Sequence, residues 1–96
     1  MSPSAEADLE AITDVRTRNS IIRKAFDLDT EPEKQGKPLS GDLAAHRAVR
    51  AAGQRCRVVY RIASLEGVVT VVVVGIRKEG DKKDVYRVAN KRLEKG

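Results

Sequence analysis

The pattern of apolar and polar positions changes midway along the chain. In the first third, Ala5, Leu9 and Ile12 recur at helical spacing, with acidic residues between them. A second stretch with helical spacing holds the apolar residues Ile21, Ile22, Ala25, Phe26 and Leu28. The spacing predicts two antiparallel helices separated by a break near residues 14–19, with Ser4 as the N-cap of the first.

From residue 46 onward the pattern is typical of strands. Residues 46–51 form a first run that ends near Gly53, and residues 55–62 then alternate. The alternation places Cys56, Val58, Tyr60 and Ile62 on one face and Arg55, Arg57, Val59 and Arg61 on the other. A turn at residues 64–67 closes a hairpin. Residues 68–75 are almost all β-branched, which is typical of a central strand buried on both faces.

The end of the chain and the connector between the two halves complete the prediction. Residues 84–88 are expected to form a last short strand and residues 89–94 a short basic helix. Residues 29–42 predict an ordered loop anchored by Leu39 and Leu43. We therefore expect one α+β domain over residues 1–96, with two N-terminal helices packed on a three- to four-stranded antiparallel twisted sheet as a two-layer sandwich.

Composition narrows the class of protein. The 96-residue chain has one cysteine and one histidine, which excludes a disulfide framework and a zinc site of the usual spacing, so no cofactor or metal is expected. Cys56 is expected to be a buried small hydrophobe. The N-terminus has no signal-peptide pattern, and the longest apolar run is too short to span a bilayer. These features predict a cytoplasmic protein with no membrane partner.

Charge is distributed unevenly along the chain. Residues 1–45 carry six Lys/Arg and nine Asp/Glu, a net charge of −3, whereas residues 46–96 carry thirteen and five, a net charge of +8. A strongly basic half favours a polyanion site there, with a merely solvated basic surface as the alternative.

Four residues of the basic half are candidates for that site. Arg50 and Arg57 fall on neighbouring strands with the same side-chain parity, Arg77 ends the β-branched strand, and Tyr86 follows a charged loop. Guanidinium groups that hold phosphate, beside a ring that stacks on a base, suit single-stranded RNA. The alternative is solvent-exposed arginines without a ligand. His46 shares the parity of Arg50 but lies four residues away, so we expect a strand-entry residue rather than a base.

Several segments of the chain, in the expected order, resemble toxins of the RelE/ParE superfamily. Residues 36–43 (GKPLSGDL) look like the loop before the sheet in these proteins, and residues 57–62 (RVVYRI) resemble their Arg-Val-x-Tyr strand. Residues 71–78 (VVVVGIRK), followed by residues 84–86 (DVY), resemble the closing strand with its arginine and terminal tyrosine. The start of the first helix is similar at Pro3, Ala5, Asp8 and Leu9.

The resemblance implies a RelE-like enzyme that cuts messenger RNA on the ribosome without a metal, by attack of a 2′-hydroxyl on the adjacent phosphate. It implies phosphate stabilisation by Arg57, leaving-group protonation or charge stabilisation by Arg77, and base stacking by Tyr86. Arg50 falls where RelE proteins often carry a basic residue that acts as a general base. An arginine keeps its proton at physiological pH, so we expect Arg50 to stabilise negative charge instead. Ala48 stands where RelE proteins can carry a second lysine, so that positive charge is absent from this position. Further RNA contacts are expected from Arg47, Arg55, Lys82 and Lys83.

The resemblance also implies a partner and leaves alternatives open. The partner is a cognate antitoxin that docks on the basic face, and the pair is expected to be able to assemble into a higher-order complex. ParE-like members have the same fold but inhibit DNA gyrase without nuclease chemistry, and an inactive homologue would only bind antitoxin. Two departures are visible: the chain starts at the helix where relatives have a short strand, and the loop between Arg77 and Tyr86 is extended. For the first, either the start was placed late or cut, or this branch of the family lacks the strand. The first departure predicts an unpaired strand edge.

Overall fold

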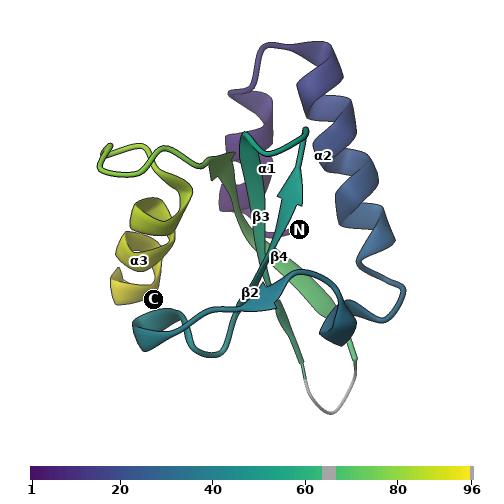
Figure 1. Ribbon diagram of the computed structural model, residues 1–96, viewed down its shortest axis with the longest axis vertical. Coiled ribbons are helices and arrows are strands. Elements are labelled where there is room, and N and C mark those ends of the chain that lie inside the picture. Colours follow the sequence, from purple (N-terminus) through teal and green to yellow (C-terminus); the bar gives the residue numbers. More distant parts are fainter. Residues whose placement is uncertain (64–66, 96) are drawn as a thin grey trace.

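Two helices open the chain in the computed structural model, which describes residues 1–63 and 67–95 (Figure 1). Helix α1 spans Pro3–Glu10 and helix α2 spans Val15–Asp27. The prediction of Ser4 as N-cap is wrong: Ser2 caps α1, because Pro3 suits the first helical position and the Ser2 hydroxyl accepts from the Ala5 N–H at 3.2 Å. The break between the helices comes earlier than expected, since Asp14 already caps α2. Among the described helices, none is long and apolar enough to cross a membrane.

Four antiparallel strands form the sheet, in the order β1-β2-β3-β4. Strand β2 spans Arg47–Ala51, β3 spans Cys56–Ile62 and β4 spans Val69–Ile76, close to the expected ranges. The connector adds β1, Lys37–Pro38, and the single turns η1, Pro32–Lys34, and η2, Gly41–Leu43, so it is ordered as predicted. Residues 64–66 of the expected hairpin turn lie outside the described residues.

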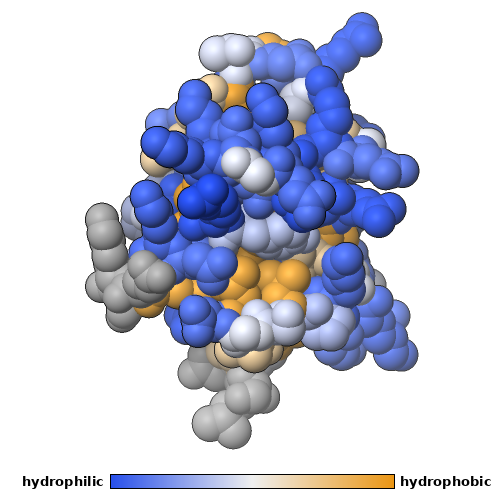
Figure 2. Space-filling model, turned by 60° about the vertical axis from the view of Figure 1, so that its left-hand side comes forward, coloured by the Kyte–Doolittle hydropathy of each residue, from blue (hydrophilic) through white to orange (hydrophobic). Residues whose placement is uncertain are grey.

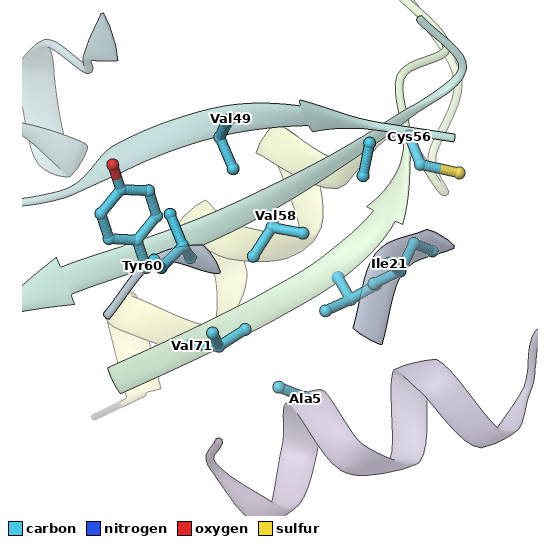
Figure 3. Close-up of a cluster of buried hydrophobic side chains, with 10 residues drawn as sticks. Ala5, Ile21, Val49, Cys56, Val58, Tyr60 and Val71 are labelled. Atoms are coloured by element: carbon cyan, nitrogen blue, oxygen red, sulfur yellow. The ribbon is translucent and has the colours of Figure 1, made fainter. Parts of the chain in front are cut away.

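The predicted register of β3 is confirmed. Cys56, Val58 and Tyr60 are at most 2% exposed and pack in one cluster with Ala5 and Ile21 of the two N-terminal helices (Figure 3). Burial raises the pKa of the Cys56 thiol, as expected for a side chain in an apolar core. Among the apolar positions on which the helix prediction rested, Phe26 points to solvent and is 71% exposed.

The C-terminal segment is helical from Val85 onward, so the prediction of a strand at residues 84–88 is wrong. Helix α3 spans Val85–Lys95, and the Asp84 carboxylate accepts from the Tyr86 N–H at its start. The helix lies against the sheet face opposite α1 and α2 (Figure 1), where Val59 and Ala89 are fully buried. The predicted two-layer sandwich is therefore corrected: the sheet is covered on both faces, and only part of the basic face stays open.

Strand β4 lies at the edge of the sheet, where a central strand was expected. Its central valines are nevertheless buried on both faces, because α1 packs on one side of β4 and α3 on the other. A bulge at Val72 shifts the pairing with β3. Tyr60 pairs with Val71 and Val59 with Val73, so one residue of β4 has no partner in β3. As a result Val71 faces α1, while Val73 faces α3.

Side chains and one backbone amide cover the outer edge of β4. Ser2 donates its N–H to the Val71 carbonyl oxygen at 2.9 Å, and Val74 donates its N–H to Asp8 Oδ2 at 3.0 Å. Arg92 of α3 donates to the Val72 carbonyl oxygen and binds the Asp8 carboxylate through both terminal nitrogens, at 2.5 and 2.7 Å. The outer edge of β4 is thus partly satisfied by α1 and α3, which lowers its tendency to pair with another chain.

The connector is held against the sheet by polar contacts. The Tyr60 hydroxyl lies 2.8 Å from the carbonyl oxygens of both Pro32 and Gln35, and Arg47 donates two hydrogen bonds to the Gln35 carbonyl oxygen at 3.1 Å. These contacts bring Gly36 onto the backbone of β2. Gly36 has φ +60°, and a Cβ there would collide with the Ala48 carbonyl oxygen.

Replacing Gly36 with alanine is expected to lower the free energy of unfolding by about 2 kcal/mol, because left-handed backbone and backbone collision both oppose a side chain. Gly53→Ala is the matched control: Gly53 also has positive φ but no atom within 4 Å of its added Cβ. Urea unfolding of both variants tests this. If both variants lose the same free energy of unfolding, the collision of the new Cβ with β2 adds nothing to the cost of the left-handed backbone.

Candidate functional site

Two arginines face each other across strands β2 and β3. Arg50 is the direct cross-strand partner of Arg57, which in turn pairs with Gly75 of β4. Strand alternation places both side chains on the α3 face, as predicted. Opposed like charges destabilise a sheet. Within the described part of the chain, neither arginine forms an ion pair with a carboxylate.

A cleft of 330 Å³ contains these arginines. The residues that line it are Lys24, Gly36, Lys37, Ala48, Val49, Arg50, Arg57 and Tyr86. Four of them are cations, and no carboxylate occurs among these described lining residues. A second cleft of 350 Å³ shares Lys37 and Tyr86 and is otherwise lined by Pro38, Leu39, Ser40 and Leu43. The face turned forward in Figure 2 shows a hydrophobic patch surrounded by hydrophilic side chains.

Lys24 and Lys37 are members of the cleft that sequence reasoning missed. Both belong to the acidic half of the chain, where the net charge concealed them. Helix α2 contributes Lys24 because it packs beside β2, and the connector contributes Lys37 because β1 pairs with β2. One feature of the sequence could have identified Lys37: it directly follows Gly36, whose backbone lies against β2. Arg23 and Lys24 also border a neighbouring cleft with Arg50, so positive charge continues onto α2.

Arg57 is oriented by the hairpin between β2 and β3. Its guanidinium donates to the carbonyl oxygens of Gln54, at 2.6 Å, and Cys56, at 3.1 Å. These neutral acceptors orient the group without cancelling its charge. The charge of Arg57 therefore remains available to a phosphate at the cleft.

Arg77 and Tyr86 lie together despite the long loop between them. The Arg77 guanidinium carbon is 4.9 Å from the centroid of the Tyr86 ring, within the range of a cation–π contact. Arg77 also forms an ion pair with Asp84 at 2.7 Å and a long one with the exposed Glu79 at 3.9 Å. Hydrogen bonding to Asp84 raises the pKa of Arg77, so this side chain stays a cation. The structure thus joins Arg77 to Tyr86, and Tyr86 to the cleft that holds Arg50 and Arg57.

The four residues predicted as secondary RNA contacts lie outside the cleft lining. Arg47 is engaged with the connector carbonyls, and Arg55 donates to the Thr17 hydroxyl of α2 at 3.2 Å. Lys82 and Lys83 are exposed in the loop before α3. The structure thus shows contacts within the protein for Arg47 and Arg55 that the sequence did not indicate. Contact with RNA stays a prediction for all four residues.

His46 is buried, with 7% of its surface exposed, and its backbone is hydrogen-bonded to Leu39 and Leu43 of the connector. Among the described residues neither ring nitrogen has a hydrogen-bond partner. Desolvation lowers the pKa of His46, and the nearby charge of Arg61 acts in the same direction. The ring is therefore neutral at pH 7 and is not one of the residues that line the cleft.

Protein stability is expected to fall between pH 7 and pH 5 because of His46. The folded-state pKa is lowered, so the unfolded chain binds the proton more tightly and stability is lost as pH drops below about 6.5. The carboxylates with lowered pKa values, Asp14, Asp81 and Asp84, titrate below this window. Urea midpoints measured at both pH values should therefore differ in the wild type and converge in His46→Leu. If His46→Leu kept the pH dependence of the wild type, groups other than His46 would be responsible for the loss of stability.

A solved structure is similar to this chain. A chain in the crystal structure of the toxin–antitoxin complex RelBE2 from Mycobacterium tuberculosis has 31% sequence identity to it and superposes with a TM-score of 0.70. The match covers 79% of this chain and 85% of that chain. No protein-family model and no curated protein sequence matches the chain.

Proposed function

This chain belongs to the RelE/ParE superfamily of toxins, and from that premise we propose that it is an endoribonuclease that cuts messenger RNA on the ribosome. The observation that carries the proposal is the cleft in which Arg50 opposes Arg57. Two arginines held opposite each other without a carboxylate cost stability, and binding of a phosphate group would offset that cost. Tyr86 at the wall of the same cleft offers a face for a base.

The proposed reaction is transesterification within the RNA strand. The 2′-hydroxyl of one nucleotide loses its proton to water as its oxygen attacks the adjacent 3′-phosphorus. The bond from phosphorus to the 5′-oxygen of the next nucleotide breaks, and that oxygen takes a proton from water, which leaves a 2′,3′-cyclic phosphate and a 5′-hydroxyl. Negative charge builds on the non-bridging oxygens, where Arg50 and Arg57 would stabilise it. Arg77, a cation tied to Asp84, would stabilise charge on the leaving oxygen rather than supply its proton. The mechanism uses no metal ion.

An antitoxin partner follows from the same premise. The similar structure is a toxin–antitoxin complex, and the two adjoining clefts combine cations with Leu39 and Leu43. A segment with acidic and apolar residues would complement both and would block access to Arg57. Co-expression with products of adjacent small genes should yield a stable complex that relieves growth arrest. If every adjacent product fails to bind, the antitoxin proposal is wrong.

Cleavage on programmed ribosomes tests the enzymatic proposal. The protein is incubated with ribosomes that carry a defined message, and the new ends are mapped. A 5′-hydroxyl end and a 2′,3′-cyclic or 3′-phosphate end are expected, and a 2′-deoxy nucleotide at the cleavage site should block the reaction. Intact messages with loss of DNA supercoiling by gyrase would instead assign the protein to the ParE-like class.

Substitution of Tyr86 separates stacking from hydroxyl chemistry. The ring contacts Arg77 and lines both clefts, so Tyr86→Phe should retain cleavage within a few-fold of wild type. Tyr86→Ala removes a base-stacking surface worth about 1–3 kcal/mol and should lower cleavage by about 10- to 100-fold. Single-turnover rates on programmed ribosomes measure both. An equal loss in the two variants would give the hydroxyl the main role.

A further inference from the structure

Asp84 is a buried carboxylate that connects the two residues at the end of the candidate site. It is 3% exposed and lies between the end of β4 and the first turn of α3. One oxygen accepts from Arg77 at 2.7 Å and from the Lys78 N–H at 2.6 Å, and the other accepts from the Tyr86 N–H at 3.2 Å. A single side chain thus binds the guanidinium of Arg77 and the backbone of Tyr86.

We propose that Asp84 is a positioning residue that holds Arg77 against Tyr86 and so sets the geometry of Tyr86 at the cleft wall and of Arg77 beside it. The inference rests on the proposed function and names a residue for which the sequence indicated no role. Arg77 has several rotatable bonds and follows the last residue of β4, so without a fixed acceptor its guanidinium would sample many positions. The Asp84 carboxylate restricts it to the site 4.9 Å above the Tyr86 ring.

The other acidic neighbours of Arg77 lack this arrangement. Glu79 lies 3.9 Å from Arg77, but its side chain is 91% exposed, so the pair is weak. Asp81 contacts Lys78 and the Lys83 N–H within the same loop. Among the described residues, only Asp84 joins a close contact with Arg77 to one with Tyr86. Both neighbours therefore serve as matched controls that remove one negative charge from the same segment.

Asp84→Asn is the test variant, because asparagine keeps the size of the side chain and is an equally good helix N-cap. It loses the charge that binds Arg77. The maximal single-turnover rate of message cleavage is expected to fall by about 10- to 100-fold, as for other losses of orientation at a reacting group. Asp81→Asn and Glu79→Gln should stay within about 2-fold of wild type. Asp84→Glu, which restores the charge on a longer side chain, should recover part of the rate.

A double-mutant cycle separates positioning from general folding. If Asp84 acts through Arg77, Asp84→Asn should lower the rate strongly in the wild type and very little in an Arg77→Ala background. Equal losses in both backgrounds, or wild-type cleavage by Asp84→Asn, would overturn the proposal. Thermal unfolding of each variant checks that the comparison is between folded proteins.

Nuclear magnetic resonance provides a readout that does not depend on cleavage. In ¹³C,¹⁵N-labelled protein, Asp84→Asn should shift the Arg77 side-chain Nε–H signal and the Tyr86 ring C–H signals, and Asp81→Asn should leave both in place. These shifts would support the positioning role even if the wild type cut no message, in which case the enzymatic proposal alone would fail. Unchanged Arg77 and Tyr86 signals in Asp84→Asn would refute the positioning role whatever the activity.

Discussion

Arg57→Ala is expected to reduce message cleavage by about 10²–10³-fold while the protein stays folded, because it removes a preorganised charge from the reacting phosphate. The structure adds a second expectation. Arg57 lies directly opposite Arg50, so its removal relieves a like-charge contact, and the free energy of unfolding should stay equal or rise slightly. Loss of activity without loss of stability distinguishes a ligand-binding arginine from one that supports the fold.

Single-turnover cleavage and urea unfolding are measured on the same preparation of Arg57→Ala. Arg16→Ala is the matched control, since Arg16 is exposed in the first turn of α2 and is not among the residues that line the cleft. It should cleave at nearly the wild-type rate. Full activity of Arg57→Ala would remove this arginine from the mechanism. A large loss of stability would instead show that its hydrogen bonds to the hairpin carbonyls hold the turn together.

Asp8→Ala is expected to lower the free energy of unfolding by about 3 kcal/mol. The Asp8 side chain is 16% exposed and accepts hydrogen bonds from Arg92 and from the Val74 N–H. Its removal leaves a partly buried guanidinium and an edge N–H without their acceptor, and each such group costs about 1–3 kcal/mol. The loss also uncovers the edge of β4, so Asp8→Ala should self-associate more readily than wild type.

Urea unfolding and sedimentation of Asp8→Ala test these two effects. Glu10→Ala in the same helix is the control, because Glu10 is exposed and its loss should change stability by less than about 0.5 kcal/mol. Arg92→Met keeps much of the aliphatic packing and removes the guanidinium. A double-mutant cycle with Asp8→Ala should show strong coupling between the two positions, and additive losses would mean that the pair contributes nothing as a unit.

The amino-acid sequence by itself was sufficient to predict which side chains of β3 point into the core and which point away from it. In residues 55–62 the alternation has period two, and a slip by one residue would expose Val58 and Tyr60 while burying Arg57. No other placement satisfies both faces, so the inward position of Cys56 and the outward position of Arg57 were predictable. The shared face of Arg50 and Arg57 follows from the same local alternation, whereas their direct pairing across β2 and β3 is set by the register of the two strands.

The last helix shows where local pattern misled. Val85, Tyr86 and Val88 are residues that favour strands, and the segment was expected to extend the sheet. Val85, Ala89 and Leu93 also recur at helical spacing, and burial of that stripe on Val59 and Val73 decides for the helix. Two periods compete in so short a segment, and only packing against the sheet selects between them.

The complete site and the covered edge were decided by tertiary structure alone. Lys24 and Lys37 enter the cleft from elements that are distant in sequence from Arg57, and Asp8 meets Arg92 across 84 positions of the chain. Asp84 acquires its partners only because α3 turns back over the end of β4. Local periodicity carries information about which face a side chain occupies, whereas the identity of its neighbours depends on how the elements pack, since many partners would satisfy the same local pattern.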